Sequence, residues 1–163
     1  YTKMAAKVAE AVADFDNIRV EPRPDVIYED DFKETRFVDI GSLAWESINA
    51  LKPLHEEWAG GIELVPTSAY GIRLYQNGSS LVMHYDKVQT HVISSIMHIA
   101  HEYEDEDEPW PIQIEDHDGN MHNIVMEAGD MVFYESAKAL HGRMTKFRGK
   151  YYANIFVHKY YLN

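Results

Sequence analysis

Two histidines and one carboxylate in this chain have the residue types and spacing that suit a metal site. His84 and Asp86 lie two positions apart on a predicted strand, and His141 lies shortly before the last predicted strand. Side chains alternate between the faces of a strand, so His84 and Asp86 point to the same side. Two histidines and a carboxylate can hold one face of an Fe(II) ion and leave the opposite face open for a co-substrate and dioxygen. This pattern predicts a non-haem iron oxygenase.

The same three residues leave other interpretations open. His84 and Asp86 could form a hydrogen-bonded pair at a strand end while His141 lies in a loop, and a His-His-carboxylate set also binds zinc. We interpret the remaining histidines as surface or hydrogen-bonded strand positions: His55, His91, His98, His101, His117, His122 and His158. The chain has no cysteine, which excludes disulfides, thiolate metal sites and a cysteine nucleophile.

The elements that must position these residues fall into a helical part and a strand-rich part. Residues 3–15 predict an amphipathic helix, and Ser42 predicts the N-cap of a second helix that Pro53 should kink or split and that Gly60-Gly61 ends. Strands are predicted at 37–40, 62–65, 70–75, 81–86, 91–100, 112–115, 122–126, 131–134 and 151–160. We therefore expect a mostly β protein with flanking helices, namely a double-stranded β-helix (jelly roll) buttressed by N-terminal helices.

Length and charge bound the class of protein. The 163 residues predict a single domain, with 1–60 as helical support and 61–163 as the jelly-roll core. A net charge of −12 repels phosphate backbones, so we expect no nucleic-acid partner. The chain lacks the run of about 18 apolar residues that a membrane span needs. Because it begins with Tyr1, we expect a soluble domain excised from a longer chain. The compartment and the oligomeric state do not follow from the sequence.

Five segments carry a family resemblance through their order and spacing: Tyr75-Gln76-Asn77-Gly78, His84-Tyr85-Asp86, Gly129-Asp130-Met131-Val132-Phe133-Tyr134, His141 and Gly149-Lys150-Tyr151. In these segments and their spacing, residues 75–160 resemble the catalytic domain of the prolyl 4-hydroxylase-like 2-oxoglutarate/Fe(II)-dependent dioxygenases. The resemblance implies that His84, Asp86 and His141 bind Fe(II).

A co-substrate needs binding residues of its own, because a carboxylate that enters a dry barrel is costly without a cation and hydrogen bonds. The resemblance implies that Tyr75 hydrogen-bonds 2-oxoglutarate and that Lys150 pairs with its distal carboxylate. Arg143 and Arg148 are rival anchors. Ascorbate is an implied reductant.

The resemblance implies an enzyme that hydroxylates an unactivated C–H bond, with a peptidyl prolyl or other peptidyl side chain as substrate. A free amino acid or small molecule is the alternative substrate, and a non-catalytic jelly-roll binding module is the alternative of another class. The chain departs from the family at Leu81, where a second tyrosine is common, and across residues 104–111. These differences leave the identity of the substrate open. Two polar segments, 21–35 and 102–108, are candidate substrate lids, and the acidic one would attract a basic peptide. A solvated loop that faces away from the site is the other interpretation of the acidic segment.

Overall fold

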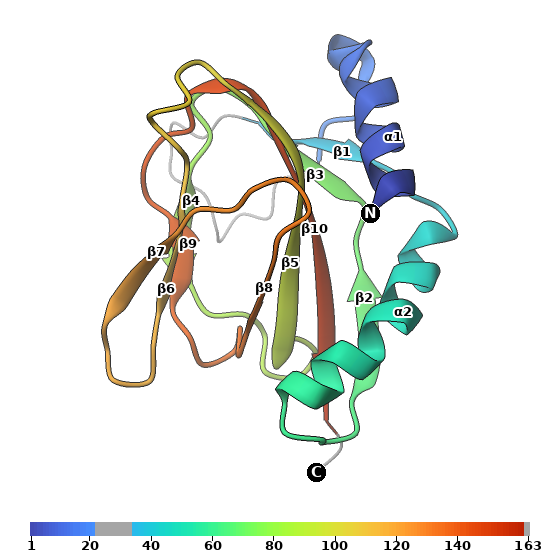
Figure 1. The fold of residues 1–163 in the computed structure, drawn as a ribbon, viewed down its shortest axis with the longest axis vertical. Helices are drawn as coiled ribbons and strands as arrows, with labels where there is room; N and C mark the ends of the chain where they lie inside the picture. Colours follow the sequence, from blue (N-terminus) through green and yellow to red (C-terminus); the bar gives the residue numbers. More distant parts are fainter. Residues whose placement is uncertain (22–33, 162–163) are drawn as a thin grey trace.

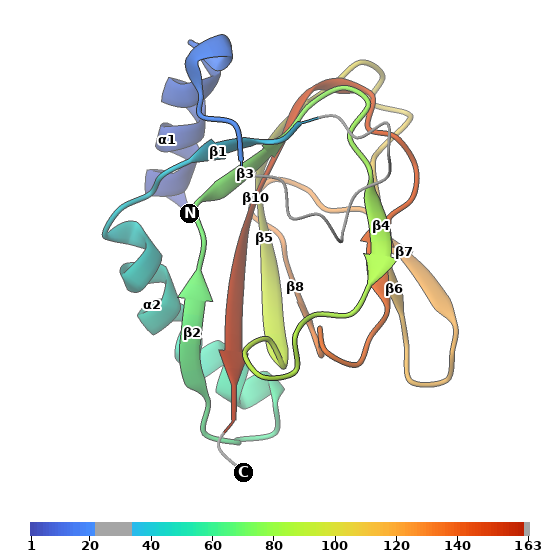
Figure 2. The same ribbon diagram turned by 180° about the vertical axis from the view of Figure 1, so that it is seen from behind.

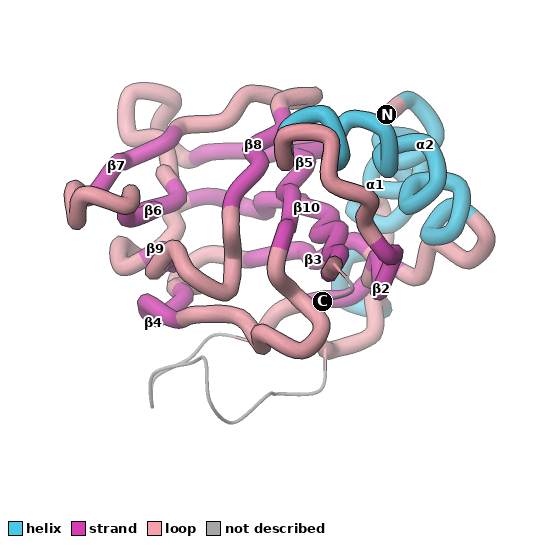
Figure 3. Tube along the Cα trace, turned by 90° about the horizontal axis from the view of Figure 1, so that it is seen from below, coloured by secondary structure: helices cyan, strands magenta, loops and turns pink. Residues whose placement is uncertain are grey.

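Two antiparallel β-sheets face each other, and two helices cover the outer side of the larger sheet (Figures 1 and 3). The computed structural model describes residues 1–21 and 34–161. The six-stranded sheet has the order β1 (Arg36–Val38), β3 (Ile72–Tyr75), β10 (Gly149–Tyr160), β5 (Ile93–Tyr103) and β8 (Met131–Tyr134), with β2 (Val65–Ala69) also paired to β10. The four-stranded sheet has the order β4 (Leu81–His84), β9 (His141–Arg143), β6 (Ile112–Glu115) and β7 (Met121–Ile124). This architecture confirms the predicted jelly roll with N-terminal helices.

The helix α1 (Thr2–Val12) packs its apolar stripe on the large sheet. Met4 and Val8 are buried in a core with residues of β3, β5 and β10, as the predicted amphipathic pattern requires. The helix is shorter than predicted, because it ends at Val12 and a separate 3-10 turn η1 (Phe15–Asn17) follows.

The helix α2 (Leu43–Trp58) lies beside β2 and buries Ile48 and Leu51. It is preceded by Ser42 and runs through Pro53 without interruption, so the predicted split at this proline is wrong. Gly60 and Gly61 follow with φ values of 81° and 84°, a conformation that favours glycine and ends the helix. No helix in the described ranges is long and apolar enough to cross a membrane.

The predicted strands are present, but several bounds differ: the strand predicted at 81–86 ends at His84, so Asp86 lies beyond it. The predicted strands 112–115 and 131–134 are present with those bounds, whereas the segment predicted at 62–65 becomes strand only from Val65 onward. The strand β9 escaped prediction because it has three residues with a glycine in the middle. A Cβ on Gly142 would lie 2.7 Å from the Leu81 carbonyl oxygen, so only glycine lets β9 approach β4 this closely.

Two bulges between β5 and β10 alter which side chains share a face of the large sheet. In β5, His98 pairs with Asn154 and Ala100 with Ala153, which leaves Ile99 as an extra residue. The extra residue brings His98 and His101 to the same face, where their ring nitrogens are 2.7 Å apart. The second bulge lies in β10 between Gly149 and Tyr151.

Candidate metal centre

Three predicted ligands meet at one end of the small sheet. The ligand atoms of His84, Asp86 and His141 all lie within 4.8 Å of one another. His84 ends β4 and is the cross-strand partner of His141, which begins β9, while Asp86 follows β4 by two residues. The antiparallel register therefore brings together residues that are far apart in the sequence.

Backbone carbonyls orient both imidazole rings. His84 Nδ1 lies 2.9 Å from the Val82 oxygen, and His141 Nδ1 lies 2.9 Å from the Ala139 oxygen. A carbonyl can only accept, so in each neutral ring Nδ1 carries the proton and Nε2 keeps its lone pair. His84 Nε2 lies 3.7 Å from Asp86 Oδ1. Two lone pairs and a carboxylate oxygen thus converge on one point.

Burial keeps the distal histidine in its ligand form. Burial, with a smaller contribution from nearby His84, lowers the pKa of His141 to about 4. Its imidazole is therefore neutral at pH 7 and available to a metal. This donor set fits Fe(II), and it leaves one side of the ion free of protein ligands.

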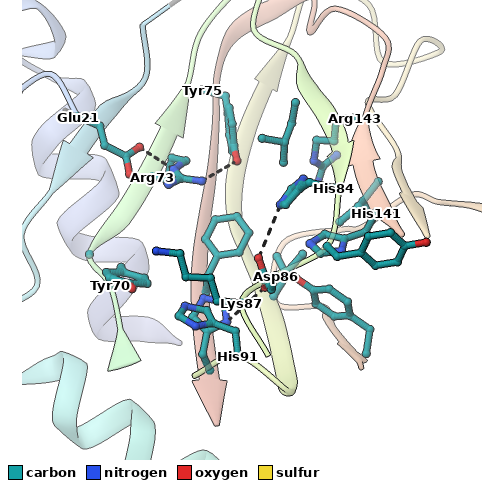
Figure 4. Close-up of a pocket in the computed structure, with 18 of the residues that line it drawn as sticks. Glu21, Tyr70, Arg73, Tyr75, His84, Asp86, Lys87, His91, His141 and Arg143 are labelled. Atoms are coloured by element: carbon teal, nitrogen blue, oxygen red, sulfur yellow. Dashed lines mark hydrogen bonds and ion pairs between the residues drawn. The ribbon is translucent and has the colours of Figure 1, made fainter. Parts of the chain in front are cut away.

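The three ligands line a cavity of about 600 Å³ between the two sheets (Figure 4). The residues around it come from both sheets and from the loop after β4: Glu21, Phe37, Tyr70, Gly71, Arg73, Tyr75, Leu81, His84, Tyr85, Asp86, Lys87, His91, Ile96, Ile112, Tyr134, His141, Arg143, Phe156 and His158. Tyr134 sets the edge of its ring against His141, with centroids 4.8 Å apart. A mostly apolar wall with a few converging polar groups is typical of a small-molecule site.

Arg143 is a buried cation in this wall. It is 1% exposed, and its guanidinium carbon lies 4.4 Å from the ring centre of Trp110 and 4.7 Å from that of Tyr152. Its Nη1 donates to the Trp110 carbonyl oxygen. Among the described residues no carboxylate contacts it. A buried charge without a counter-ion is costly, so this position favours an anionic ligand.

Tyr75, the predicted hydrogen-bond partner of the co-substrate, belongs to the wall of the same cavity. It is fully buried, lines the cavity, and its hydroxyl lies 3.5 Å from Arg73 Nη1. Tyr75 and Arg143 therefore both face the space beside the metal ligands.

Lys150 does not reach this cavity, which corrects the predicted anchor. It is the extra residue of the β10 bulge, its side chain is 58% exposed, and Nζ lies 3.5 Å from Glu102 Oε2. The bulge turns it toward solvent, an irregularity that spacing alone does not reveal. The rival anchor Arg148 is also outside the cavity and pairs with Glu108 at 2.8 Å.

Sequence reasoning missed several polar cavity residues, among them Arg73, His91 and His158. Arg73 is two residues before Tyr75 on β3, so strand alternation could have found it. It forms an ion pair with Glu21, with Nη2 2.6 Å from Oε1. The rings of His91 and His158 are tilted by 45° with centres 4.0 Å apart, and only the pairing of β10 with β5 brings them together.

The structure describes one of the two candidate lids, the acidic segment 102–108, and only the ends of the other, 21–35. In the acidic segment, Glu102 and Tyr103 belong to β5, and none of residues 102–108 is among the residues around the cavity. The loop after Tyr103 lies at the opposite end of the sheets from the loop after β4 (Figure 2). The acidic segment therefore matches the solvated-loop interpretation. Most of the other segment, residues 22–33, lies outside the described residues.

Comparison of the sequence with family models and with curated proteins finds no match. Solved structures do match over nearly the whole chain. A prolyl-4-hydroxylase from Pseudomonas putida has a TM-score of 0.69 at 16% identity, covering 99% of this chain and 88% of that one. A prolyl hydroxylase from Trichoplax adhaerens, solved with a hypoxia inducible factor oxygen degradation domain peptide fragment, has a TM-score of 0.62 at 8% identity, covering 97% and 79%. An oxidoreductase of the 2OG-Fe(II) oxygenase family from Burkholderia pseudomallei has a TM-score of 0.62 at 14% identity, covering 96% and 78%. The chain thus has the fold of the prolyl 4-hydroxylases and 2OG-Fe(II) oxygenases.

Proposed function

We propose that this protein is a 2-oxoglutarate- and Fe(II)-dependent oxygenase that hydroxylates an unactivated C–H bond. One observation carries the proposal. A single cavity contains three converging metal ligands and a buried Arg143 that contacts no carboxylate among the described residues. The ligands suit Fe(II), and the unneutralised guanidinium suits a dicarboxylate that also reaches the metal.

The residues then have distinct roles. His84, Asp86 and His141 would hold Fe(II). Arg143 takes the place of Lys150 as the anchor for the distal carboxylate. It lies two residues beyond His141 on the same face of β9, about 7 Å along the strand, a span that a five-carbon dicarboxylate can bridge. Tyr75 would donate its hydroxyl proton to the same carboxylate.

Fe(II) with 2-oxoglutarate and dioxygen supplies the oxidising power for C–H hydroxylation, with succinate and carbon dioxide as co-products. The protein contributes orientation and a dry site. Ile96, Ile112 and Phe156 form an apolar wall of the cavity, and Tyr134 is buried beside His141. Exclusion of water here strengthens the contact between Arg143 and a bound carboxylate.

We further propose a peptidyl side chain, with proline first, as the substrate, and a free amino acid or small molecule as the alternative. Exposed Tyr70 and Tyr85 lie at the edge of the cavity and provide contact surface for an extended chain. The likeness to prolyl hydroxylases, one of them in complex with a peptide, supports the same choice. A non-catalytic binding module is the weaker candidate, because it needs neither the three ligands nor the buried Arg143.

The test is succinate release under air with Fe(II), 2-oxoglutarate and ascorbate, with and without proline-containing peptides and free amino acids. We expect Fe(II)-dependent succinate release that one class of additive stimulates. Asp86→Ala is the negative control, since it removes one ligand. If the wild-type protein binds peptides but releases no succinate with any additive, the binding module is the better description.

A further inference from the structure

The carboxylate of Asp86 lies between two histidines on opposite sheets. Its Oδ1 is 3.7 Å from Nε2 of His84 (Figure 4). Its Oδ2 is 3.8 Å from Nδ1 of His158. His84 belongs to β4 in the small sheet and His158 to β10 in the large sheet. Each carboxylate oxygen therefore has a different histidine as its neighbour.

His158 is held by two buried serines. Its Nδ1 lies 2.7 Å from Ser94 Oγ, and Ser94 Oγ lies 2.6 Å from Ser136 Oγ. Ser136 in turn donates to the His91 carbonyl oxygen at 2.9 Å. Both serines are fully buried, and His158 is 5% exposed. Ser136 also accepts the backbone N–H of Asp86 on its own carbonyl oxygen at 2.9 Å, so the chain of contacts returns to the metal ligand.

The direction of these hydrogen bonds follows from counting protons. A hydroxyl has one proton, and that of Ser136 is used by the His91 carbonyl. Ser94 must then donate to Ser136, which leaves Ser94 Oγ as an acceptor for His158. His158 Nδ1 therefore carries a proton and donates it to Ser94 Oγ. Asp86 Oδ2 lies beside the same edge of the ring at 3.8 Å, too far for a hydrogen bond of its own. The other tautomer would place a lone pair against the carboxylate.

We propose that Ser136, Ser94 and His158 form a positioning chain: their hydrogen bonds fix the His158 ring beside Oδ2 of Asp86, and this leaves Oδ1 for the metal. This inference rests on the proposed function. A carboxylate that binds through one oxygen leaves more of the metal's coordination sphere for a dicarboxylate and dioxygen than one that binds through both. His158 is a positioning residue, because it acts through Asp86.

The need for such a chain follows from where Asp86 lies. It is beyond the end of β4, in a loop, so no strand pairing fixes its side chain. His158 and Ser94 lie on the paired strands β10 and β5, where they are register partners. The rigid large sheet thus orients the one ligand that the loop provides, as is usual for residues around a metal's direct ligands.

Cobalt(II) binding to the metal-free protein tests this without catalysis. We would measure the Co(II) dissociation constant and the visible d–d spectrum for Ser94→Ala and His158→Phe. We expect Co(II) affinity to fall about 10- to 100-fold in both, with an altered spectrum. His158→Asn should bind almost as tightly as wild type, because its amide nitrogen can take the place of Nδ1.

Ser95→Ala is the matched control. Ser95 is the next residue on β5, is equally buried, and its hydroxyl has no partner within the part of the chain that the structure describes. It should bind Co(II) like wild type. Thermal unfolding of each metal-free variant establishes that it is folded; if His158→Phe is not, Ser94→Ala decides.

The outcomes separate the two proposals. If wild type binds Co(II) and the folded Ser94→Ala and His158→Phe variants bind it with the same affinity and spectrum, the positioning chain is overturned and the oxygenase proposal stands. If wild type itself binds no Co(II), the metal centre and the proposed function fail, and the positioning chain fails with them.

Discussion

Replacement of Arg143 by methionine should specifically weaken the binding of 2-oxoglutarate. The guanidinium is buried between two aromatic rings and contacts no carboxylate in the described part of the chain, so a bound dicarboxylate would supply its missing counter-ion. A hydrogen bond to a charged group contributes about 1.5–3 kcal/mol. The dissociation constant of 2-oxoglutarate should therefore be roughly 10- to 150-fold larger in Arg143→Met than in wild type. Methionine fills a similar volume between the rings and removes an unneutralised buried charge, so the variant should still fold.

Two measurements check this expectation. Calorimetric titration of 2-oxoglutarate into the anaerobic Fe(II) protein gives the dissociation constant directly. Denaturant unfolding gives it through linkage: co-substrate at 100 times its dissociation constant should stabilise wild type by about 2.7 kcal/mol. With a 100-fold weaker constant the same concentration should stabilise Arg143→Met by only about 0.4 kcal/mol.

Lys150→Met is the matched control, because Lys150 is solvent-exposed and pairs with Glu102 outside the cavity. It should bind 2-oxoglutarate like wild type. The reasoning would be refuted if Arg143→Met bound 2-oxoglutarate like wild type while Lys150→Met lost its affinity for it. The β10 bulge would then not keep Lys150 out of the site.

Other perturbations have equally definite expected outcomes. Asp86→Ala should remain folded by circular dichroism yet lose 2-oxoglutarate turnover entirely; full decarboxylation would remove Asp86 from the metal site. Gly142→Ala places a Cβ 2.7 Å from the Leu81 carbonyl oxygen, so separation of β9 from β4 should cost about 1–3 kcal/mol in unfolding free energy and weaken Co(II) binding. Burial lowers the pKa of Lys159 from 10.5 to about 8. Between these two pH values the unfolded chain binds more protons than the folded one, so the free energy of unfolding rises with pH by at most about 3 kcal/mol. Lys159→Met should lack this rise when denaturant unfolding is measured across pH 7–10. Neutralising Asp105, Glu106, Asp107 and Glu108 to Asn and Gln should leave substrate-stimulated turnover and its salt dependence unchanged, because these side chains lie outside the cavity; a loss confined to basic peptides would contradict this.

The sequence was most informative where local periodicity and burial coincide. Alternation at Ile112 to Glu115 predicted a strand with the observed bounds, because one of its faces is buried. The short apolar run Met131 to Tyr134 after the Gly129-Asp130 turn did the same. Strand β9 was missed because Gly142 is there for close approach to β4, and a glycine between a histidine and an arginine has no strand pattern. The helix through Pro53 was misjudged because the proline is exposed and removes only one backbone donor.

The three candidate metal ligands were predictable from their spacing in the sequence, although Asp86 lies just beyond the end of β4 and not on the strand. His84 and Asp86 are two residues apart, and the family-like spacing indicated His141. The exposure of Lys150 was not predictable, because the bulge adds a residue there and reverses the side to which its side chain points. His158 and Ser94 could not be connected to Asp86 from one sequence, because their proximity depends on the register between two long strands.

The place of β10 has a consequence for how the protein is made. It follows every other described strand in the chain, yet it lies in the middle of the large sheet, paired with β2, β3 and β5. A ribosome adds about 5–20 residues per second. The three earlier strands therefore lack their shared partner until β10 has been synthesised. During that interval their backbone edges and apolar side chains are open to mispairing with other chains. Nascent copies of this protein should therefore be clients of chaperones until synthesis passes Tyr160.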